Sequence, residues 1–211
     1  MQIKICGITQ RKDAELAVEL GANMLGFIFY KRSKRCISFE QAFSISSELP
    51  QEIERVGVFV NAAHDQIISG ILEVGLDAVQ LHGEETPLYL KILKRKLVKY
   101  RLPVKIIKAI HDSTLIDQYA TPYLLVDAKP NGQNYGGQGV LSDWELAALA
   151  ANNKNIILAG GLKVQNIEQA LAQDVFALDI CSGIELGPGI KDHQKMRQLF
   201  AAKENYYELV S

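Results

Sequence analysis

A cysteine and an aspartate each close a short apolar run of the sequence. Cys6 ends the run 3–6 (IKIC), and Asp127 ends the run 123–127 (YLLVD). A carboxylate directly after apolar residues is unfavourable unless it is paired or faces a solvated opening. A thiolate can act as a base, although a lone cysteine after an apolar run is more often a small buried hydrophobe. Cys6 and Asp127 are therefore candidates for proton transfer, while a structural cysteine and a loop-capping aspartate stay open as alternatives.

Two glycine-containing segments indicate an anion site. Gly160 and Gly161 stand at the end of the run 155–160 (NIILAG), just before a helical pattern, and Ser182 and Gly183 follow the run 176–181 (FALDIC). Glycine lets backbone N–H groups approach an anion closely, and helix N-termini favour negative charge. A glycine pair alone is often only a turn, but the two segments together predict a phosphate site.

A basic cluster over 31–35 (KRSKR) follows the run 24–29 (MLGFIF). A solvated loop is the ordinary interpretation of such a cluster. The alternative is that it fixes an anionic group of a substrate, for which arginine is well suited because its planar fork pairs with a carboxylate through two bonds.

These candidates need a scaffold, and the pattern of apolar runs predicts one. Runs of four to seven residues, rich in β-branched or aromatic side chains, alternate with segments of helical periodicity such as 12–20, 39–49, 87–97 and 164–172. Such runs suit strands that are buried on both faces, and strand–helix alternation implies a parallel sheet. Eight strands in 211 residues favour a closed barrel over an open doubly wound sheet. The fold class predicted is α/β, a single-domain (β/α)8 TIM barrel over residues 1–211. The runs are 3–6, 24–29, 55–60, 77–81, 104–110, 123–127, 155–160 and 176–181.

In such a barrel the active site lies at the C-terminal ends of the strands. Seven of the eight predicted strands end in polar or reactive residues, which would converge on one mouth. They are Cys6–Gly7, Tyr30–Arg35, Asn61, His82–Gly83, Asp127, Gly160–Gly161 and Ser182–Gly183.

Composition and charge exclude several other classes of protein. The net charge of −1 gives no reason to expect a nucleic acid or an anionic membrane as partner. No signal peptide and no run long enough to span a bilayer are visible. The three cysteines show no CxxC spacing, and the four histidines have no metal-ligand spacing, so we expect neither disulfides nor a metal site, and a cytoplasmic location. Cys36 and Cys181 are expected to be small buried side chains without a role.

Taken together, the motifs resemble those of the phosphoribosylanthranilate isomerases of tryptophan biosynthesis, and they follow that family's order from one end of the chain to the other. They are KICGIT (4–9), GFIFYKRSKR (26–35), VGVFVN (56–61), AVQLHGEE (78–85), LLVDAK (124–129), YGGQG (135–139), LAGGL (158–162), DICSGIE (179–185) and PGIKD (188–192).

The resemblance implies an aldose–ketose isomerase that carries out an Amadori rearrangement, the third step of tryptophan biosynthesis from chorismate. N-(5-phosphoribosyl)anthranilate would become 1-(o-carboxyphenylamino)-1-deoxyribulose 5-phosphate without metal or organic cofactor. By the same resemblance Cys6 is the general base, Asp127 the general acid and Arg35 the ligand of the anthranilate carboxylate. His82 would also bind substrate, and the phosphate would lie against Gly160, Gly161, Ser182 and Gly183.

The resemblance leaves some features of the chain open. It is compatible with a monomer or a homodimer whose only other partner is the small-molecule substrate. Cys181 departs from the family pattern, because serine or asparagine is frequent there. The segment 127–137 (DAKPNGQNYGG) has the composition of a mobile lid.

Two other functions remain as alternatives. Another phosphate-binding barrel enzyme of amino-acid anabolism, such as an aldolase, synthase or epimerase, is one, and an aldolase would use Lys108 or Lys129 at a strand end. The ordinary interpretation of both lysines is a solvated or phosphate-pairing side chain. A non-catalytic barrel used for ligand sensing is the other, and it predicts loss of the acid–base pair.

Overall fold

The computed structural model describes residues 1–127, 144 and 154–210, and its eight principal strands close into a barrel. Every strand pairs in parallel with the next one, and the last pairs in parallel with the first. The predicted (β/α)8 barrel is therefore confirmed. The strands are β1 (Gln2–Cys6), β2 (Met24–Ile28), β3 (Glu54–Phe59), β4 (Ala78–Leu81), β5 (Lys105–Ile110), β6 (Tyr123–Val126), β7 (Asn155–Leu158) and β8 (Ala177–Ile180).

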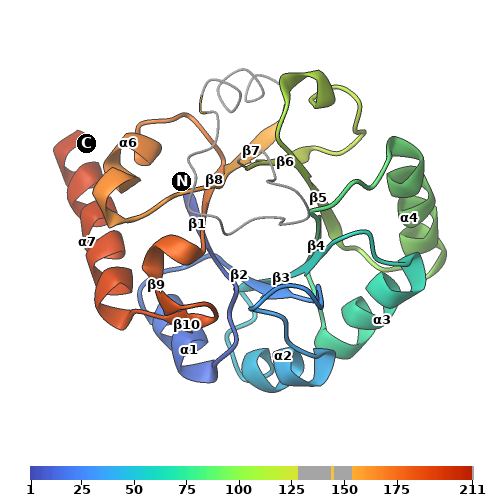
Figure 1. The fold of residues 1–211 in the computed structure, drawn as a ribbon, viewed down its shortest axis with the longest axis horizontal. Coiled ribbons are helices and arrows are strands. Elements are labelled where there is room, and N and C mark those ends of the chain that lie inside the picture. Colours follow the sequence, from blue (N-terminus) through green and yellow to red (C-terminus); the bar gives the residue numbers. More distant parts are fainter. Residues whose placement is uncertain (128–143, 145–153, 211) are drawn as a thin grey trace.

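Helices surround the barrel on its outside (Figure 1). They are α1 (Arg11–Glu19), α2 (Phe39–Ser46), α3 (His64–Val74), α4 (Pro87–Lys99), α6 (Ile167–Leu171) and α7 (His193–Val210). Three 3-10 turns accompany them, η1 (Ser113–Leu115), η2 (Val164–Asn166) and η3 (Ser182–Ile184), together with a small antiparallel pair, β9 (Glu185–Gly187) and β10 (Ile190–Lys191).

Local sequence signals explain where several helices begin and end. Ser38 forms a capping box with Gln41 at the start of α2, and the hydroxyl of Thr86 accepts from the backbone of Tyr89 at the start of α4. Gly21, shortly after the end of α1, has a φ of 93°. That left-handed conformation favours glycine and turns the chain from α1 toward β2.

The two faces of the sheet bury different side chains. The larger apolar core lies between the strands and the helices, and includes Ile3, Ile5, Phe27 and Leu178. A smaller cluster fills the barrel interior and consists of Met24, Val56, Ala78, Ile107, Leu125, Ile157, Ala159 and Ala177. Successive residues of a strand face opposite sides, so every second position points into the barrel.

The observed strands differ from the predicted runs by one or two residues at their ends. The pattern over 164–172 is a 3-10 turn followed by a five-residue helix rather than one helix. Asp127 comes directly after β6, and its backbone N–H donates to Ile110 O at 3.1 Å. The predicted lid beyond Asp127, Lys129 and the motif YGGQG lie outside the described residues.

Candidate active site

A pocket of about 500 Å³ opens at the C-terminal ends of the strands. Cys6, Asp127, Arg35 and His82 all line it, as do Gly160, Gly161 and Ser182. The structure thus brings seven of the eight predicted site residues to one mouth. Gly183 is not among the described lining residues.

The thiol of Cys6 sits at the end of β1 and is 5% exposed. Its strand neighbour is Gly26, and a Cβ added at Gly26 would lie 2.7 Å from Cys6 Sγ. Glycine on β2 therefore leaves the space that the thiol occupies. Gly7, the next residue, has a φ of 71° and passes close to Arg35 and Cys181.

A buried ion pair lies below this thiol in the barrel interior. Lys4 Nζ contacts both carboxylate oxygens of Asp179 at 2.9 Å, and the Lys4 side chain is fully buried. Burial alone would lower the pKa of Lys4, but the Asp179 carboxylate and the Cys6 side chain raise it above its usual value. The barrel therefore holds a fixed ammonium group next to Cys6.

Cys181 is the second thiol at this mouth. The sequence predicted a side chain without a role, but Cys181 lines the pocket, and the Cys6 and Cys181 thiols shift each other's pKa. Cys36 is half-buried and is not among the described residues that line the pocket.

Asp127 belongs to a chain of three polar side chains. His82 Nε2 lies 3.1 Å from Asp127 Oδ2, and His82 Nδ1 lies 2.7 Å from Gln80 Nε2. An amide nitrogen only donates, so this arrangement puts the histidine proton on Nε2, toward Asp127. The reversed amide would put that proton on Nδ1 and let Nε2 accept a proton from the acid form of Asp127. Gln80 Oε1 is buried without a partner among the described residues, and the reversed amide would satisfy it.

Arg35 is held by a carboxylate that the sequence did not single out. Its Nε and Nη2 donate to Glu185 at 2.6 to 3.1 Å, and Nη1 takes part in none of these bonds. Lys191 Nζ donates to Glu185 at 3.0 Å and also to the backbone carbonyls of Cys6 and Cys181. Burial raises the pKa of the Glu185 carboxyl, but the bonds from Arg35 and Lys191 outweigh it and lower the pKa. Glu185 and Lys191 therefore fix Arg35 against the ends of β1 and β8.

The two glycine loops pack directly against each other. Gly160 and Gly161 have φ values of 82° and 63°, which side chains rarely adopt. A Cβ added at Gly183 would overlap the carbonyl oxygen of Leu162. Gly183 is therefore needed for the close approach of the loops, while Gly160, Gly161 and Ser182 line the pocket.

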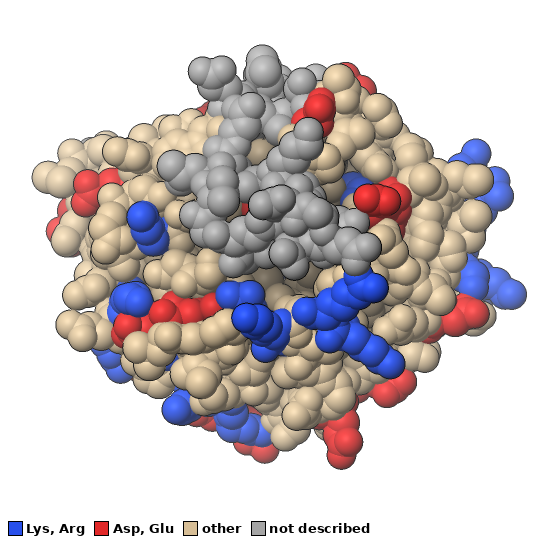
Figure 2. Space-filling model, viewed as in Figure 1, with Lys and Arg blue, Asp and Glu red and all other residues tan. Residues whose placement is uncertain are grey.

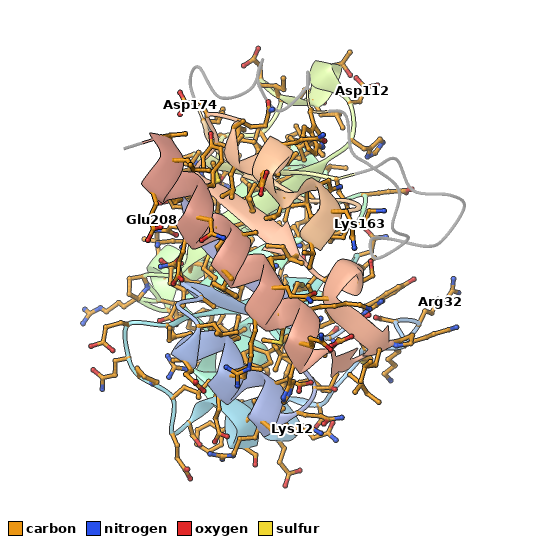
Figure 3. The ribbon with its side chains drawn as sticks, turned by 90° about the vertical axis from the view of Figure 1, so that its left-hand side faces the viewer. Lys12, Arg32, Asp112, Lys163, Asp174 and Glu208 are labelled. Carbon is orange, nitrogen blue, oxygen red and sulfur yellow. The ribbon has the colours of Figure 1, made fainter. Side chains whose placement is uncertain are left out.

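The basic cluster over 31–35 lies at the rim. Lys31, Arg32 and Lys34 are exposed, whereas Arg35 is half-buried. Basic side chains gather near the middle of the face seen down the barrel (Figure 2). In the side view Arg32 and Lys163 lie toward the right, and Asp174, which precedes β8, lies toward the left (Figure 3). The cluster is thus partly solvated, as its ordinary interpretation holds, but Arg32, Ser33, Lys34 and Arg35 also line the pocket.

Lys108 matches neither of the two interpretations of the sequence, which were an aldolase lysine at a strand end and a solvated or phosphate-pairing side chain. It is 2% exposed, and its ammonium group donates to Leu81 O, Gly83 O and a Glu85 oxygen. Burial lowers the pKa of Lys108, although Glu85 opposes this shift. Glu85 in turn accepts from the backbone of Asn61 and Gly83. Lys108 is therefore neither solvated nor phosphate-pairing, and it is not among the described lining residues. It braces the ends of β3 and β4.

The sequence reasoning missed four buried charged groups that support the site, Lys4, Asp179, Glu185 and Lys191. A signal existed for the first two, because each interrupts an otherwise apolar strand and a buried charge requires a partner. The first and last strands are neighbours in any closed barrel, so opposite charges on them could have been paired.

The described residues contain neither a candidate metal centre nor a candidate membrane-spanning helix. No group of three or more His, Cys, Asp or Glu side chains there could hold a metal ion. None of the helices described combines the length and apolar character needed to cross a bilayer.

Comparison with known sequences identifies a family. Residues 3–202 match the family model described as N-(5'phosphoribosyl)anthranilate (PRA) isomerase. A relative named N-(5'-phosphoribosyl)anthranilate isomerase from Citrifermentans bemidjiense is 42% identical over 201 residues, covering 95% of each chain. One of the same name from Thermotoga neapolitana is 38% identical, covering 94% of this chain and 96% of the relative.

Comparison with solved structures leads to the same family. The phosphoribosyl anthranilate isomerase from Thermus thermophilus superposes with a TM-score of 0.85 at 36% identity, covering 97% of this chain and 99% of the other. A phosphoribosyl anthranilate isomerase in complex with reduced 1-(o-carboxyphenylamino)-1-deoxyribulose 5-phosphate gives 0.81 at 35% identity, with the same coverage. A 3-hexulose-6-phosphate synthase from Salmonella typhimurium, 12% identical, shares the fold alone.

Proposed function

Because the chain belongs to the N-(5′-phosphoribosyl)anthranilate isomerase family, we propose that Cys6 and Asp127 are the base and the acid of that isomerisation. The chain is an aldose–ketose isomerase of tryptophan biosynthesis. It converts N-(5′-phosphoribosyl)anthranilate into 1-(o-carboxyphenylamino)-1-deoxyribulose 5-phosphate. The single observation that carries the assignment of roles is that one pocket is lined by Cys6 at the end of β1 and by Asp127 after β6.

Asp127 starts the reaction in this proposal. It donates a proton to the ring oxygen of the ribose as the bond from C1′ to that oxygen breaks, which leaves a protonated Schiff base. His82 is the positioning residue for this step. With its own proton on Nε2, His82 donates to Asp127 Oδ2, which leaves the proton of the acid form on Oδ1 and directed at the substrate.

Cys6 completes the proton transfer. The positive Schiff base acidifies the neighbouring C2′–H bond, and the Cys6 thiolate removes that proton to give an enol amine. The enol amine then tautomerises to the ketone. One proton leaves Asp127 and one arrives at Cys6, so the substrate is isomerised without net gain or loss of protons.

The ends of the substrate are held by groups on different loops. Nη1 of Arg35 remains available for the anthranilate carboxylate while Glu185 fixes the rest of the guanidinium. Backbone N–H groups at Gly160, Gly161 and Ser182 bind the phosphate. Gly183 contributes indirectly, because its missing side chain allows the two loops to meet.

The test is a fluorescence assay that follows the disappearance of freshly prepared phosphoribosylanthranilate. We expect Cys6→Ala to abolish turnover, and Asp127→Asn to do the same because an amide cannot donate a carboxylic proton. Cys36→Ser is the matched thiol control and should retain wild-type activity. Near-normal turnover of Cys6→Ala would remove the base assignment. A loss below about tenfold (~1.4 kcal/mol) in Asp127→Asn would argue against general acid catalysis.

The proposed chemistry consists of proton transfers alone, so it requires no metal or organic cofactor. Dialysis against a chelator followed by assay in metal-free buffer should leave kcat/KM unchanged. A loss of activity that added divalent metal restores would contradict this part of the proposal.

We further propose that the chain is a single domain, works in the cytoplasm and is a monomer or a homodimer. One closed barrel includes strands from both ends of the chain, which supports the single domain. One related structure is described as a set of monomers made from the dimeric phosphoribosylanthranilate isomerase of Thermotoga maritima. Light scattering of the purified chain distinguishes the two assembly states, and a larger assembly would refute the proposal.

A further inference from the structure

The barrel closure places two thiols side by side. Lys4 pairs with Asp179 and Ile5 with Ile180 in the parallel register of β1 and β8, and Cys6 and Cys181 are the next residues on the two chains. Neighbouring strands lie about 4.8 Å apart. Both cysteines line the pocket, and each shifts the pKa of the other.

Charged groups surround this pair from every neighbouring element. Lys4 on β1 and Asp179 on β8 interact with Cys6 from below. On the other side, Lys191 on β10, Arg35 in the loop after β2 and Glu185 on β9 interact with Cys181. Among the described residues, three cations and two carboxylates therefore interact with one or the other thiol, which leaves one positive charge to be balanced. A single thiolate would balance it.

We propose that Cys181 is a positioning residue of the isomerase, which shares one proton with Cys6 and so supplies Cys6 as a thiolate when the substrate is bound. This inference deepens the proposed function and rests on Cys6 being the base. Cys181 acts through Cys6 and itself touches no reacting atom.

The shifts in pKa agree with this geometry. The interaction with Cys6 lowers the pKa of Cys181 to about 7, helped by the charges of Lys191 and Arg35 and opposed by burial. The interaction with Cys181 and burial raise the pKa of Cys6. The pair therefore loses its first proton near neutral pH, and the charge rests mainly on Cys181 before the reaction.

The proton movements balance within the pair. In the resting state Cys6 carries the shared proton and donates it to the Cys181 thiolate. This transfer leaves Cys6 as the thiolate and Cys181 as the thiol. Cys6 then takes the C2′ proton, which leaves both thiols protonated. One proton passes to solvent before the next turnover, while Asp127 regains the proton it donated.

Serine at position 181 would keep a polar side chain beside Cys6 but lose the shared charge, because a hydroxyl does not ionise near neutral pH. Cys6 would then have to ionise alone, buried and beside Asp179, both of which raise its pKa. A thiol with an ordinary pKa of ~8.5 is about 3% ionised at pH 7, whereas a group with a pKa of about 7 is about half ionised.

The test compares wild type with Cys181→Ser and Cys181→Ala in kcat/KM measured across pH. We expect about a tenfold loss at pH 7 in both variants, with the apparent pKa of the base displaced upward and activity recovering near pH 9. A purely structural role would lower kcat/KM equally at every pH. Ultraviolet absorbance of the thiolate provides a second measurement, independent of activity. Wild type should show one thiolate titrating near pH 7, and Cys181→Ser none.

Cys36→Ser serves as the control for both measurements and should match wild type in each. An unchanged or acid-displaced pH profile in Cys181→Ser, or a loss equal at all pH values, would overturn the inference. So would a wild-type thiolate that first appears near pH 8.5. The inactivity of Cys6→Ala in the same assay separates the two claims. If Cys6→Ala turns over normally, the role of Cys6 fails. If it is inactive while Cys181→Ser titrates like wild type, only the role of Cys181 fails.

Discussion

Replacing Lys4 by methionine should destabilise the barrel far more than removing a surface charge. Lys4 is fully buried, Asp179 is 7% exposed, and the ammonium group reaches both carboxylate oxygens at 2.9 Å. Lys4→Met would leave Asp179 as an unpaired charge inside the barrel. Breaking a buried pair in this way costs about 3–5 kcal/mol. That is a large fraction of the ~5–15 kcal/mol by which domains are stable.

Urea unfolding measures the free energy of unfolding, and thermal unfolding measures Tm, for wild type, Lys4→Met, Asp179→Leu and the double variant. For a chain of this length each kcal/mol lowers Tm by about 2–4 °C, so each single variant should lose roughly 6–20 °C. The double variant removes both charges together, and we expect it within about 1 kcal/mol of wild type. Arg11→Met is the control. Arg11 pairs with Glu48 at 2.7 Å, but the two side chains are 35% and 77% exposed, so the expected change is below ~1 kcal/mol.

Two results would refute this reasoning. Single variants that lose less than about 1 kcal/mol would show that the pair is effectively solvated. Losses that add in the double variant would show that each side chain contributes by packing alone, without a charge interaction between them.

Three further perturbations test other parts of the site. Arg35→Ala should raise KM about tenfold or more by removing a charged hydrogen bond to the anthranilate carboxylate, and an unchanged KM would place that carboxylate elsewhere. Glu185 has a pKa below its ordinary value of 4.5, so its contribution to stability is complete above that pH and is lost as the pH falls through the lower folded value. Acid unfolding of Glu185→Gln should therefore show a shallower loss between pH 4.5 and the acid limit than wild type, and parallel curves would contradict this. Gly183→Ala should cost about 1–3 kcal/mol in urea unfolding and raise KM, because the new methyl group forces two loops apart. Gly187→Ala, which has nothing within 4 Å of the added Cβ, is its control and should change neither value.

The fold was predictable because its main signal is local. Strands buried on both faces are short and uniformly apolar, so the run 24–29 predicts β2 to within a residue. The connection between β5 and β6 carried no such signal, and it contains the 3-10 turn Ser113–Leu115. The positions of Cys6 and Asp127 followed from a rule about barrels, which requires only that the strand ends be recognised.

The contacts that tune the site were not predictable, because each depends on how the barrel closes. Lys4 and Asp179 lie 175 residues apart and meet only because β8 returns beside β1. The same closure brings Cys181 to Cys6. Arg35 was predicted as a ligand for a substrate carboxylate, and no local pattern indicated that Glu185, 150 residues away, already binds most of its fork.

The close approach of Gly183 to the carbonyl of Leu162 has a consequence for the engineering of this barrel. The loops after β7 and β8 share one contact surface, so neither can be exchanged for that of another barrel while the other stays unchanged. A chimaera with its crossover between Leu162 and Gly183 would join halves that were never selected to fit. A crossover before β7 carries both loops over together. The last two strand–loop units therefore have to be exchanged as a single module.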